Sequence, residues 1–152
     1  INDAVGGVEV TVMQDVVSES KGVYLTAGET KTLNGDEAYC YLRNRDLTKF
    51  ESATDRLRRD EQYLGAFIKK LQSQSESNSA LAVSIYNSTS DYLVTNVEFT
   101  DLVSTLMGYQ YSQDCMYTVP GETVKGDTYE EFNINSEEFN DLMIQLFYKK
   151  VD

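Results

Sequence analysis

The sequence LNGDEAYCYLRNRDLTKFESATDRLRRDEQYLGAFIKK, at residues 33–70, combines a short helix, an arginine-rich segment and a long helix. The short helix is predicted over residues 36–42, after a turn at Asn34–Gly35. The long helix is predicted over about residues 54–71. Its apolar positions recur at spacings of seven, four and three residues, as one buried helical stripe requires: Leu57, Leu64, Ile68 and Leu71.

Extended segments are predicted on both sides of these helices. Valines recur at every second position over residues 8–12, a period that is typical of a strand. Residues 22–33 are predicted to form a second extended segment. Toward the C-terminus, Tyr, Val, Phe and Ile are concentrated at residues 115–119 and 128–134. These two segments are predicted to be strands around a turn at Pro120–Gly121.

Helices are predicted to alternate with the strands. Residues 73–79 are rich in serine and are predicted to be a loop, and helices follow near residues 80–86 and 98–107. A last helix begins near Asn135, which together with Glu138 resembles a capping box. Its apolar face comprises Phe139, Leu142, Met143, Leu146 and Phe147. Alternation of this kind predicts an α/β fold with layered α-β-α packing around a central mixed sheet.

The composition is that of an ordinary globular protein. The 152 residues are 41% hydrophobic and 25% charged with a single proline, which is enough for one compact domain with its own core. No stretch is long and apolar enough to span a bilayer. The net charge of −12 argues against general affinity for nucleic acid, which a surface of this sign repels.

Positive charge is concentrated in one segment of this acidic chain. All five arginines fall within residues 43–59, and with Lys49 they outweigh three carboxylates to give this segment a net charge of +3. A guanidinium is planar, permanently charged and able to contact two phosphate oxygens at once. The segment is therefore predicted to be a local anion-binding site.

The content of histidine and cysteine restricts the chemistry. The chain has no histidine, which excludes Ser-His-Asp and Cys-His nucleophiles and histidine-bound metals. Cys40 and Cys115 lie far apart in the sequence and permit one disulfide at most. Because Cys40 sits in the apolar run AYCYL, a free buried thiol is the favoured interpretation.

The spacing of the arginines suggests how they could converge. Arg43 and Arg45 leave the same face if their segment is extended, whereas Arg56 and Arg59 share one face of a helix near its first turn. Free backbone N–H groups at such a helix start also favour an anion. A pyrophosphate could thus lie between two pairs of guanidinium groups. The alternative is a set of surface ion pairs with neighbouring carboxylates, each worth about 0 to 1 kcal/mol.

Several segments in this order resemble the bacterial LytR-CpsA-Psr family. The sequence NDAVGGVEV at residues 2–10 is similar to the entry of the family pattern, and LNGDEAYCYLRNR matches its Arg-x-Arg element. TDRLRRDEQYLGAFIKK at residues 54–70 matches its Arg-x-x-Arg helix, and MYTVPGE with a final helix is similar to its C-terminal pattern. The resemblance makes residues 1–152 the C-terminal part of a single domain that lacks its N-terminal strands.

The resemblance implies transfer of a polyprenyl-pyrophosphate-linked glycopolymer, of teichoic acid or capsule type, to peptidoglycan at the outer face of the bacterial cytoplasmic membrane. It implies a divalent cation such as Mg²⁺, bound mainly by residues that precede this segment, and an N-terminal membrane anchor. The isolated chain is accordingly expected to be inactive. The four arginines that match the family motifs are the predicted catalytic residues: Arg43, Arg45, Arg56 and Arg59.

Other predicted contacts and two departures complete the candidate site. Arg58 is assigned either to salt bridging or to the periphery of the bound phosphate, and Asp60 is predicted to be among the substrate-binding residues. Three apolar residues of the same helix are candidates to line a cavity for the lipid, with ordinary core packing as the alternative: Leu64, Phe67 and Ile68. Asp60 replaces the family's usual glutamine, and Ala53 stands where the family tends to have an acid. These departures leave open a non-catalytic module that binds polyprenyl phosphate or regulates the cell envelope.

Asp3 is the one acidic residue beside the Gly6–Gly7 turn that could be taken for a metal ligand. A structural, hydrogen-bonding role is the favoured interpretation, because such a carboxylate commonly stabilises the backbone of a turn. No metal ligand is therefore assigned to this chain.

Overall fold

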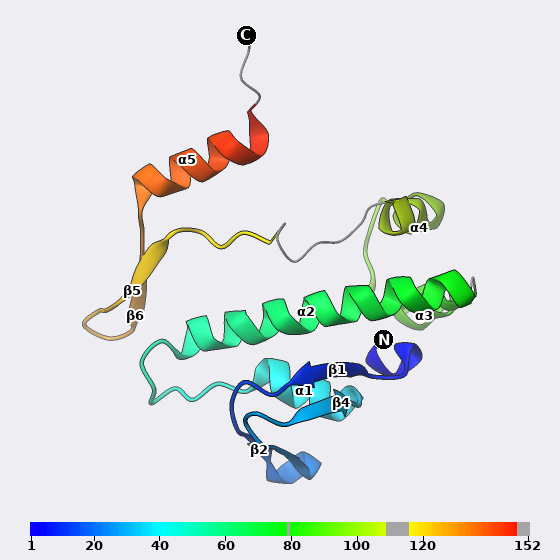
Figure 1. The fold of residues 1–152 in the computed structure, drawn as a ribbon, viewed down its shortest axis with the longest axis horizontal. Coiled ribbons are helices and arrows are strands. Elements are labelled where there is room, and N and C mark those ends of the chain that lie inside the picture. Colours follow the sequence, from blue (N-terminus) through cyan, green and yellow to red (C-terminus); the bar gives the residue numbers. More distant parts are fainter. Residues whose placement is uncertain (79, 109–115, 149–152) are drawn as a thin grey trace.

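The computed structural model describes residues 1–78, 80–108 and 116–148 (Figure 1). Its strands are β1 (Val8–Thr11), β2 (Val16–Ser18), β3 (Val23–Leu25), β4 (Thr30–Leu33), β5 (Gly121–Lys125) and β6 (Glu130–Ile134). Its α-helices are α1 (Gly35–Arg43), α2 (Ser52–Ser77), α3 (Leu81–Thr89), α4 (Phe99–Gly108) and α5 (Ser136–Phe147). Short 3-10 turns occur at η1 (Asn2–Val5), η2 (Glu19–Lys21) and η3 (Ser90–Tyr92).

The described strands form three antiparallel pairs. β1 pairs with β4 from Val8 opposite Leu33 to Thr11 opposite Thr30, and β2 pairs with β3. β5 pairs with β6, so that Gly121 lies opposite Ile134. Together with five helices, these pairs give the α/β class that the sequence predicts.

We call residues 1–92 the body and residues 116–148 the arm. The long helix α2 crosses the body, with β1, β4 and α1 on one of its sides (Figure 1). The arm extends from the region where α2 begins, whereas α3 and α4 lie near the opposite end of that helix (Figure 1).

Among the residues whose burial the structure describes, the core lies in the body. The alternating valines of β1 give a strict inward and outward pattern, as predicted, and the described hydrophobic side chains that are buried all come from residues 5–81. They are Val5, Val8, Val10, Val12, Val16, Val23, Leu25, Leu33, Ala38, Cys40, Tyr41 and Leu81. Cys40 is a free buried thiol, as predicted, and Cys115 lies outside the described residues.

Local signals explain the position of α1. Asn34 accepts a hydrogen bond from the backbone N–H of Glu37, and Glu37 accepts one from the N–H of Asn34, both at 3.0 Å. This capping box begins the helix one residue earlier than predicted. Asp3 accepts a hydrogen bond from the N–H of Gly35 at 2.8 Å, which confirms its structural role. A Cβ on Gly35 would approach the Asp3 carboxylate to 2.7 Å.

Two predictions for α2 were wrong. The serine-rich segment is helical through Ser77, so the helix is longer than expected and a loop does not begin at residue 73. Leu57 and Leu64 are also exposed, at 43% and 47%, and do not belong to a buried stripe. Leu71 packs on the core as predicted, and Ile68 is partly buried. The other residues of the packed face are Tyr63, Ala66 and Phe67, which lie on one side of the helix together with Leu71.

The arm shows regular structure without a core. Residues 116–119 are not a strand, which corrects the prediction, and β5 instead begins after Pro120. The tight turn of this hairpin is at residues 126–129. In the body, the segment at residues 22–33 that was predicted to be extended divides into two strands, β3 and β4. Asn135 caps α5 as predicted, by accepting from the N–H of Glu138 at 3.3 Å, yet no described residue of α5 is buried.

Helices α3 and α4 confirm the two predicted between residues 80 and 107. α3 packs against α2 and η1, where Leu81 joins the core and Ile85 packs on it. Among the described residues, no helix has the length and hydropathy needed to cross a membrane.

Candidate anion-binding site

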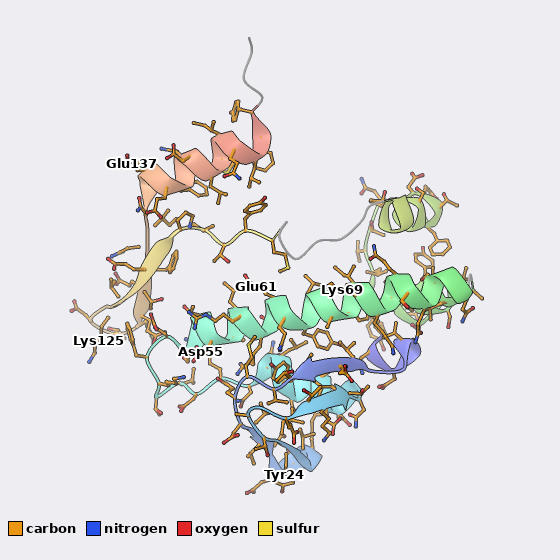
Figure 2. All side chains as sticks on the ribbon, viewed as in Figure 1. Tyr24, Asp55, Glu61, Lys69, Lys125 and Glu137 are labelled. Carbon is orange, nitrogen blue, oxygen red and sulfur yellow. The ribbon has the colours of Figure 1, made fainter. Side chains whose placement is uncertain are left out.

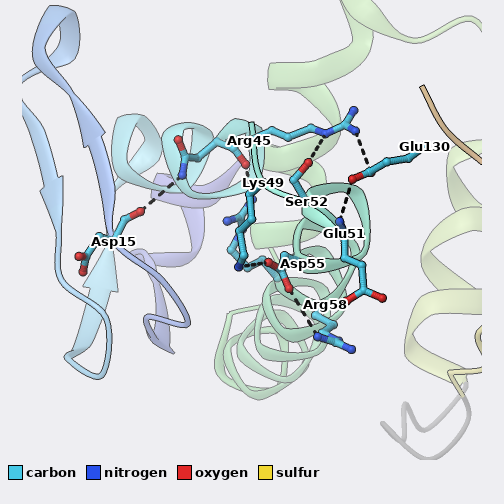
Figure 3. A network of polar contacts seen from close by, with 10 residues as sticks. Asp15, Arg45, Lys49, Glu51, Ser52, Asp55, Arg58 and Glu130 are labelled. Carbon is cyan, nitrogen blue, oxygen red and sulfur yellow. Dashed lines mark hydrogen bonds and ion pairs between the residues drawn. The ribbon is translucent and has the colours of Figure 1, made fainter. Parts of the chain in front are cut away.

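Arg45 lies between the body and the arm (Figure 3). Its Nε donates a hydrogen bond to Ser52 Oγ at 3.1 Å, and its Nη2 lies 3.7 Å from Glu130 Oε2. The other carboxylate oxygen of Glu130 accepts a hydrogen bond at 2.8 Å from the backbone N–H of Glu51, the residue that precedes α2. One arginine therefore contacts both the start of α2 and the first residue of β6.

Arg59 is the most deeply buried charged residue among those described, with 0% of its surface exposed. Nη2 donates to the backbone carbonyl of Asn44, and the guanidinium lies 5.8 Å from the ring centroid of Tyr41. Nε and Nη1 are buried and have no hydrogen-bond partner in the described structure. Burial lowers the pKa of Arg59, although Tyr41 and nearby carboxylates oppose this effect. A buried cation with two unsatisfied donor groups is costly unless an acceptor approaches it.

Arg56 and Asp60 lie on the same helix as Arg59. Both are partly buried, and burial raises the pKa of Asp60 above its usual value, against the lowering effect of Arg56 and Arg59. Since an ionised carboxylate repels a phosphate, Asp60 reduces the positive potential that the two arginines produce.

Three cations of the arginine-rich segment make ion pairs. Besides Arg45, Lys49 lies 2.6 Å from Asp55, and Arg58 lies 3.5 Å from the same carboxylate. The side chain of Arg58 is 63% exposed. No ion pair involves Arg43, Arg56 or Arg59 within the part of the chain that the structure describes. The ion-pair alternative therefore describes half of these cations.

The predicted arrangement of the arginines was wrong in two respects. Arg43 is the last residue of α1 and is exposed, whereas Arg45 follows in irregular backbone, so the two do not share the face of a strand. α2 begins at Ser52, which places Arg56 and Arg59 in its second and third turns rather than near its first. The free N–H groups at the helix start therefore lie next to Arg45 and Ser52, not next to Arg56 and Arg59.

The three apolar candidates occupy different environments. Phe67 packs against the core and stacks on Tyr63 with ring centroids 6.3 Å apart. Ile68 is partly buried, and Leu64 is exposed. The structure therefore does not bring these three side chains to one surface beside the arginines.

A groove of about 980 Å³ lies between the loop after α1 and the tip of the β5–β6 hairpin. Arg45, Lys49 and Lys125 line it together with the exposed side chains of Phe50 and Tyr129. Lys125 lies at the hairpin tip, near the end of α2 that carries Asp55 (Figure 2).

No local sequence pattern marks the arm as part of this site. Glu130 is 79 residues from Glu51 along the chain, and no local pattern marks such a contact. The net charge of the arginine-rich segment could have suggested a search for a carboxylate partner, but it could not have indicated which one.

The acidic residues do not form a metal site by themselves. Within residues 1–78, 80–108 and 116–148, no three Asp, Glu or Cys side chains converge as a cation requires. The described residues of this chain therefore do not provide a divalent-cation site by themselves.

The fold and the arginine-rich segment place the chain among α/β proteins with a candidate oxyanion site. The LytR_cpsA_psr family model matches residues 1–147. This chain belongs to that family.

Solved structures share the fold. The chain superposes on B. subtilis TagV with a TM-score of 0.70 and 24% identity, covering 98% of this chain and 60% of TagV. Protein gbs0355 from Streptococcus agalactiae gives a TM-score of 0.71 at 20% identity, over 99% of this chain and 54% of that protein. A LytR-Csp2A-Psr enzyme from Actinomyces oris gives 0.66 at 18%, with coverages of 95% and 58%. The chain thus spans 54–60% of these three proteins. No curated protein sequence matches it significantly.

Proposed function

We propose that this chain supplies the arginine site of a protein that transfers a polyprenyl-pyrophosphate-linked cell-wall glycopolymer to peptidoglycan. The protein acts at the outer face of the bacterial cytoplasmic membrane, and the glycopolymer is of teichoic acid or capsule type. Membership of the LytR_cpsA_psr family supports this proposal. So does the clustering of five arginines within 17 residues of a chain whose net charge is −12.

The single observation that carries the proposal is the state of Arg59. Its guanidinium is fully buried, lacks an ion pair among the described residues and leaves two nitrogens without acceptors. A protein gains nothing in stability from such a group, because burial of an uncompensated cation is unfavourable. A pyrophosphate oxygen would satisfy both the charge and the donors. Because Arg59 is fully buried, the residues that cover it must move before a ligand can contact it.

The chemistry follows from the group that these arginines would hold. A hydroxyl of peptidoglycan attacks the sugar-bearing phosphorus, a new phosphodiester bond forms, and polyprenyl phosphate leaves with the bridging oxygen. The hydroxyl proton passes to the departing phosphate or to water. Arg45, Arg56 and Arg59 would stabilise the negative charge that develops on the phosphate oxygens. Arg43, the fourth predicted catalytic residue, is exposed at the end of α1 and would assist them, whereas Arg58 would contact the ligand at its periphery.

Calorimetric titration tests this proposal. A soluble short-chain polyprenyl pyrophosphate is titrated into the protein that contains this chain, with and without magnesium. Arg56→Ala and Arg59→Ala are each expected to weaken binding at least tenfold, because each removes one charge-assisted contact. Lys69→Ala is the matched control, since Lys69 is an exposed cation of the same helix (Figure 2).

Equal affinity in the wild type and in the arginine variants would overturn the proposal. Binding that depends on the arginines justifies a transfer assay with lipid-linked saccharide and peptidoglycan. Turnover by residues 1–152 alone would contradict the expectation that this segment binds without catalysing.

A second candidate is a module that binds polyprenyl phosphate without chemistry. Asp60 supports it, because this partly buried carboxylate adjoins Arg56 and Arg59 and would oppose the extra charge of a transition state. Tight lipid binding without transfer by the whole protein would favour this candidate. Restoration of transfer by Asp60→Gln would favour the first proposal.

A further inference from the structure

Glu130 provides the charged contact between the β5–β6 hairpin and the body. Its two carboxylate oxygens face different partners, the backbone N–H of Glu51 at 2.8 Å and the guanidinium of Arg45 at 3.7 Å (Figure 3). The side chain is 22% exposed, and Oε2 is buried without a hydrogen-bond partner. Arg45 thus has an ionic contact with Glu130 but no well-formed hydrogen bond to it.

These partners are the groups that bind a phosphate. A guanidinium and a backbone N–H beside the start of a long helix both favour negative charge. Glu51 adopts a left-handed conformation with φ of 61°, which is unfavourable for a residue with a side chain. Its N–H donates to Glu130, so an unusual backbone conformation serves this carboxylate.

Within the part of the chain that the structure describes, the arm has few other side-chain contacts with the body. Thr123 Oγ1 lies 3.3 Å from Thr54 Oγ1, and Thr118 donates to Glu61 at 2.9 Å, both without burial of an apolar side chain of the arm. The groove lined by Arg45 and Lys125 separates the hairpin tip from the loop after α1. Release of Glu130 would therefore cost little and would open the groove toward Arg45.

We propose that Glu130 is an internal competitor for the anion that Arg45 binds, so that a phosphate-bearing ligand must displace this carboxylate to occupy the place beside Arg45. The proposal rests on the proposed function, because it assumes that Arg45 contacts a phosphate group. The carboxylate and a phosphate cannot occupy the same place, and the ligand's affinity is reduced by the fraction of protein that is closed. Glu130 would thereby favour ligands with enough negative charge to displace it.

Inorganic pyrophosphate is the probe for competition. Its affinity for the protein is measured by calorimetry in the wild type, in Glu130→Gln and in Glu131→Gln. Glu130→Gln is expected to bind about fivefold more tightly, the size that a partly exposed ion pair supports. Glu131→Gln is the matched control, because Glu131 is the next residue of the same strand and is exposed. It removes the same charge and is expected to change affinity by less than about twofold.

Hydrogen exchange of the Glu51 amide is the second measurement and requires no ligand. In Glu130→Ala this amide loses its acceptor, so its exchange is expected to accelerate at least tenfold relative to Glu131→Ala. Unchanged exchange would show that Glu130 does not hold the Glu51 amide and would overturn the proposed competition.

The outcomes separate this proposal from the proposed function. If Arg45→Ala abolishes binding while Glu130→Gln binds equally or more weakly than the wild type, Glu130 positions Arg45 and competition is wrong. If pyrophosphate binds to no variant, or binds independently of Arg45, the anion site itself fails and competition fails with it.

Discussion

The body and the arm contain the same kinds of elements but differ in what holds them. In the body, the buried valines of residues 5–23 pack in one cluster with Leu33 of β4 and Tyr41 of α1. In the arm, β5, β6 and α5 are equally regular, yet none of their described side chains is buried, and Phe147 is 70% exposed. Hairpin pairing and helix capping thus define the arm's structure, whereas tertiary packing defines the body.

The difference between the body and the arm matters for the candidate site because Arg45 contacts both. Its Ser52 contact belongs to the body, and its Glu130 contact belongs to the arm. A stable body can hold the arginines in place while the more weakly attached arm moves, as binding sites commonly require.

The largest expected effect is on stability, and it is tested by truncating one leucine in the body and one in the arm. Leu33→Ala is expected to lower the free energy of unfolding by about 3 kcal/mol, because Leu33 is fully buried and a cavity would remain. Leu146→Ala in the arm, where the leucine is 37% exposed, is expected to lower it by less than about 1 kcal/mol. Urea denaturation measures both. Equal losses would show that the arm also contributes to a cooperative core.

A second prediction tests whether the buried guanidinium of Arg59 lowers the stability of the body. Arg59→Met is expected to raise the free energy of unfolding by about 1.5 kcal/mol, because a buried, unpaired guanidinium is replaced by an apolar side chain of similar length. The same variant is expected to lose affinity for polyprenyl pyrophosphate. Arg58→Met, at an exposed position, is the stability control and is expected to change it by less than about 0.5 kcal/mol. A destabilised Arg59→Met would mean that Asn44 and Tyr41 satisfy the cation.

The sequence predicted elements best where the signal was local. The turn at Asn34–Gly35 indicated where α1 begins, and Asn135 with Glu138 indicated where α5 begins, because such signals involve only residues that are close in the sequence. The reciprocal capping box of Asn34 and Glu37 has the same local character, but only the turn was predicted from the sequence. The position of the hairpin in the arm was predicted wrongly because both Pro120–Gly121 and Gly126 are turn signals. The turn was predicted at Pro120–Gly121. In the structure Pro120 precedes β5, and the chain reverses after Gly126.

The sequence predicted which arginines belong to the candidate site, but it did not predict how they are arranged in space. Leu57 and Leu64 have the periodicity of a buried face, yet the face that packs is chosen by contact with β1 and α1. The burial of Arg59 depends likewise on Tyr41 and Asn44, which approach it from α1 and the residue after it. Charge patterning alone makes an arginine look exposed, since such residues are rarely buried.

The two helix caps provide a smaller test of the same contrast. Asn34→Ala removes a reciprocal capping box in the body and is expected to lower the free energy of unfolding by about 1 kcal/mol. Asn135→Ala removes one 3.3 Å hydrogen bond in the arm, and its global effect is expected to be smaller. Local fraying of α5, seen as faster amide exchange, is the expected result there. A larger global loss for Asn135→Ala would contradict the weak attachment of the arm.

The smallest expected effect concerns Asp60 and depends on pH. Burial raises the pKa of Asp60 in the folded protein, so the folded state binds more protons than the unfolded state between the two pKa values. Stability therefore falls as pH rises through this window, and the ionised carboxylate costs stability at pH 7. Asp60→Asn is expected to be more stable than the wild type by about 0.5 kcal/mol at pH 7, discounted for partial exposure. The gain should shrink on acidification and vanish below about pH 3.9, the ordinary value for aspartate. Urea denaturation from pH 3 to pH 8 measures this difference, and a gain that persists at pH 3 would assign the effect to packing instead of charge.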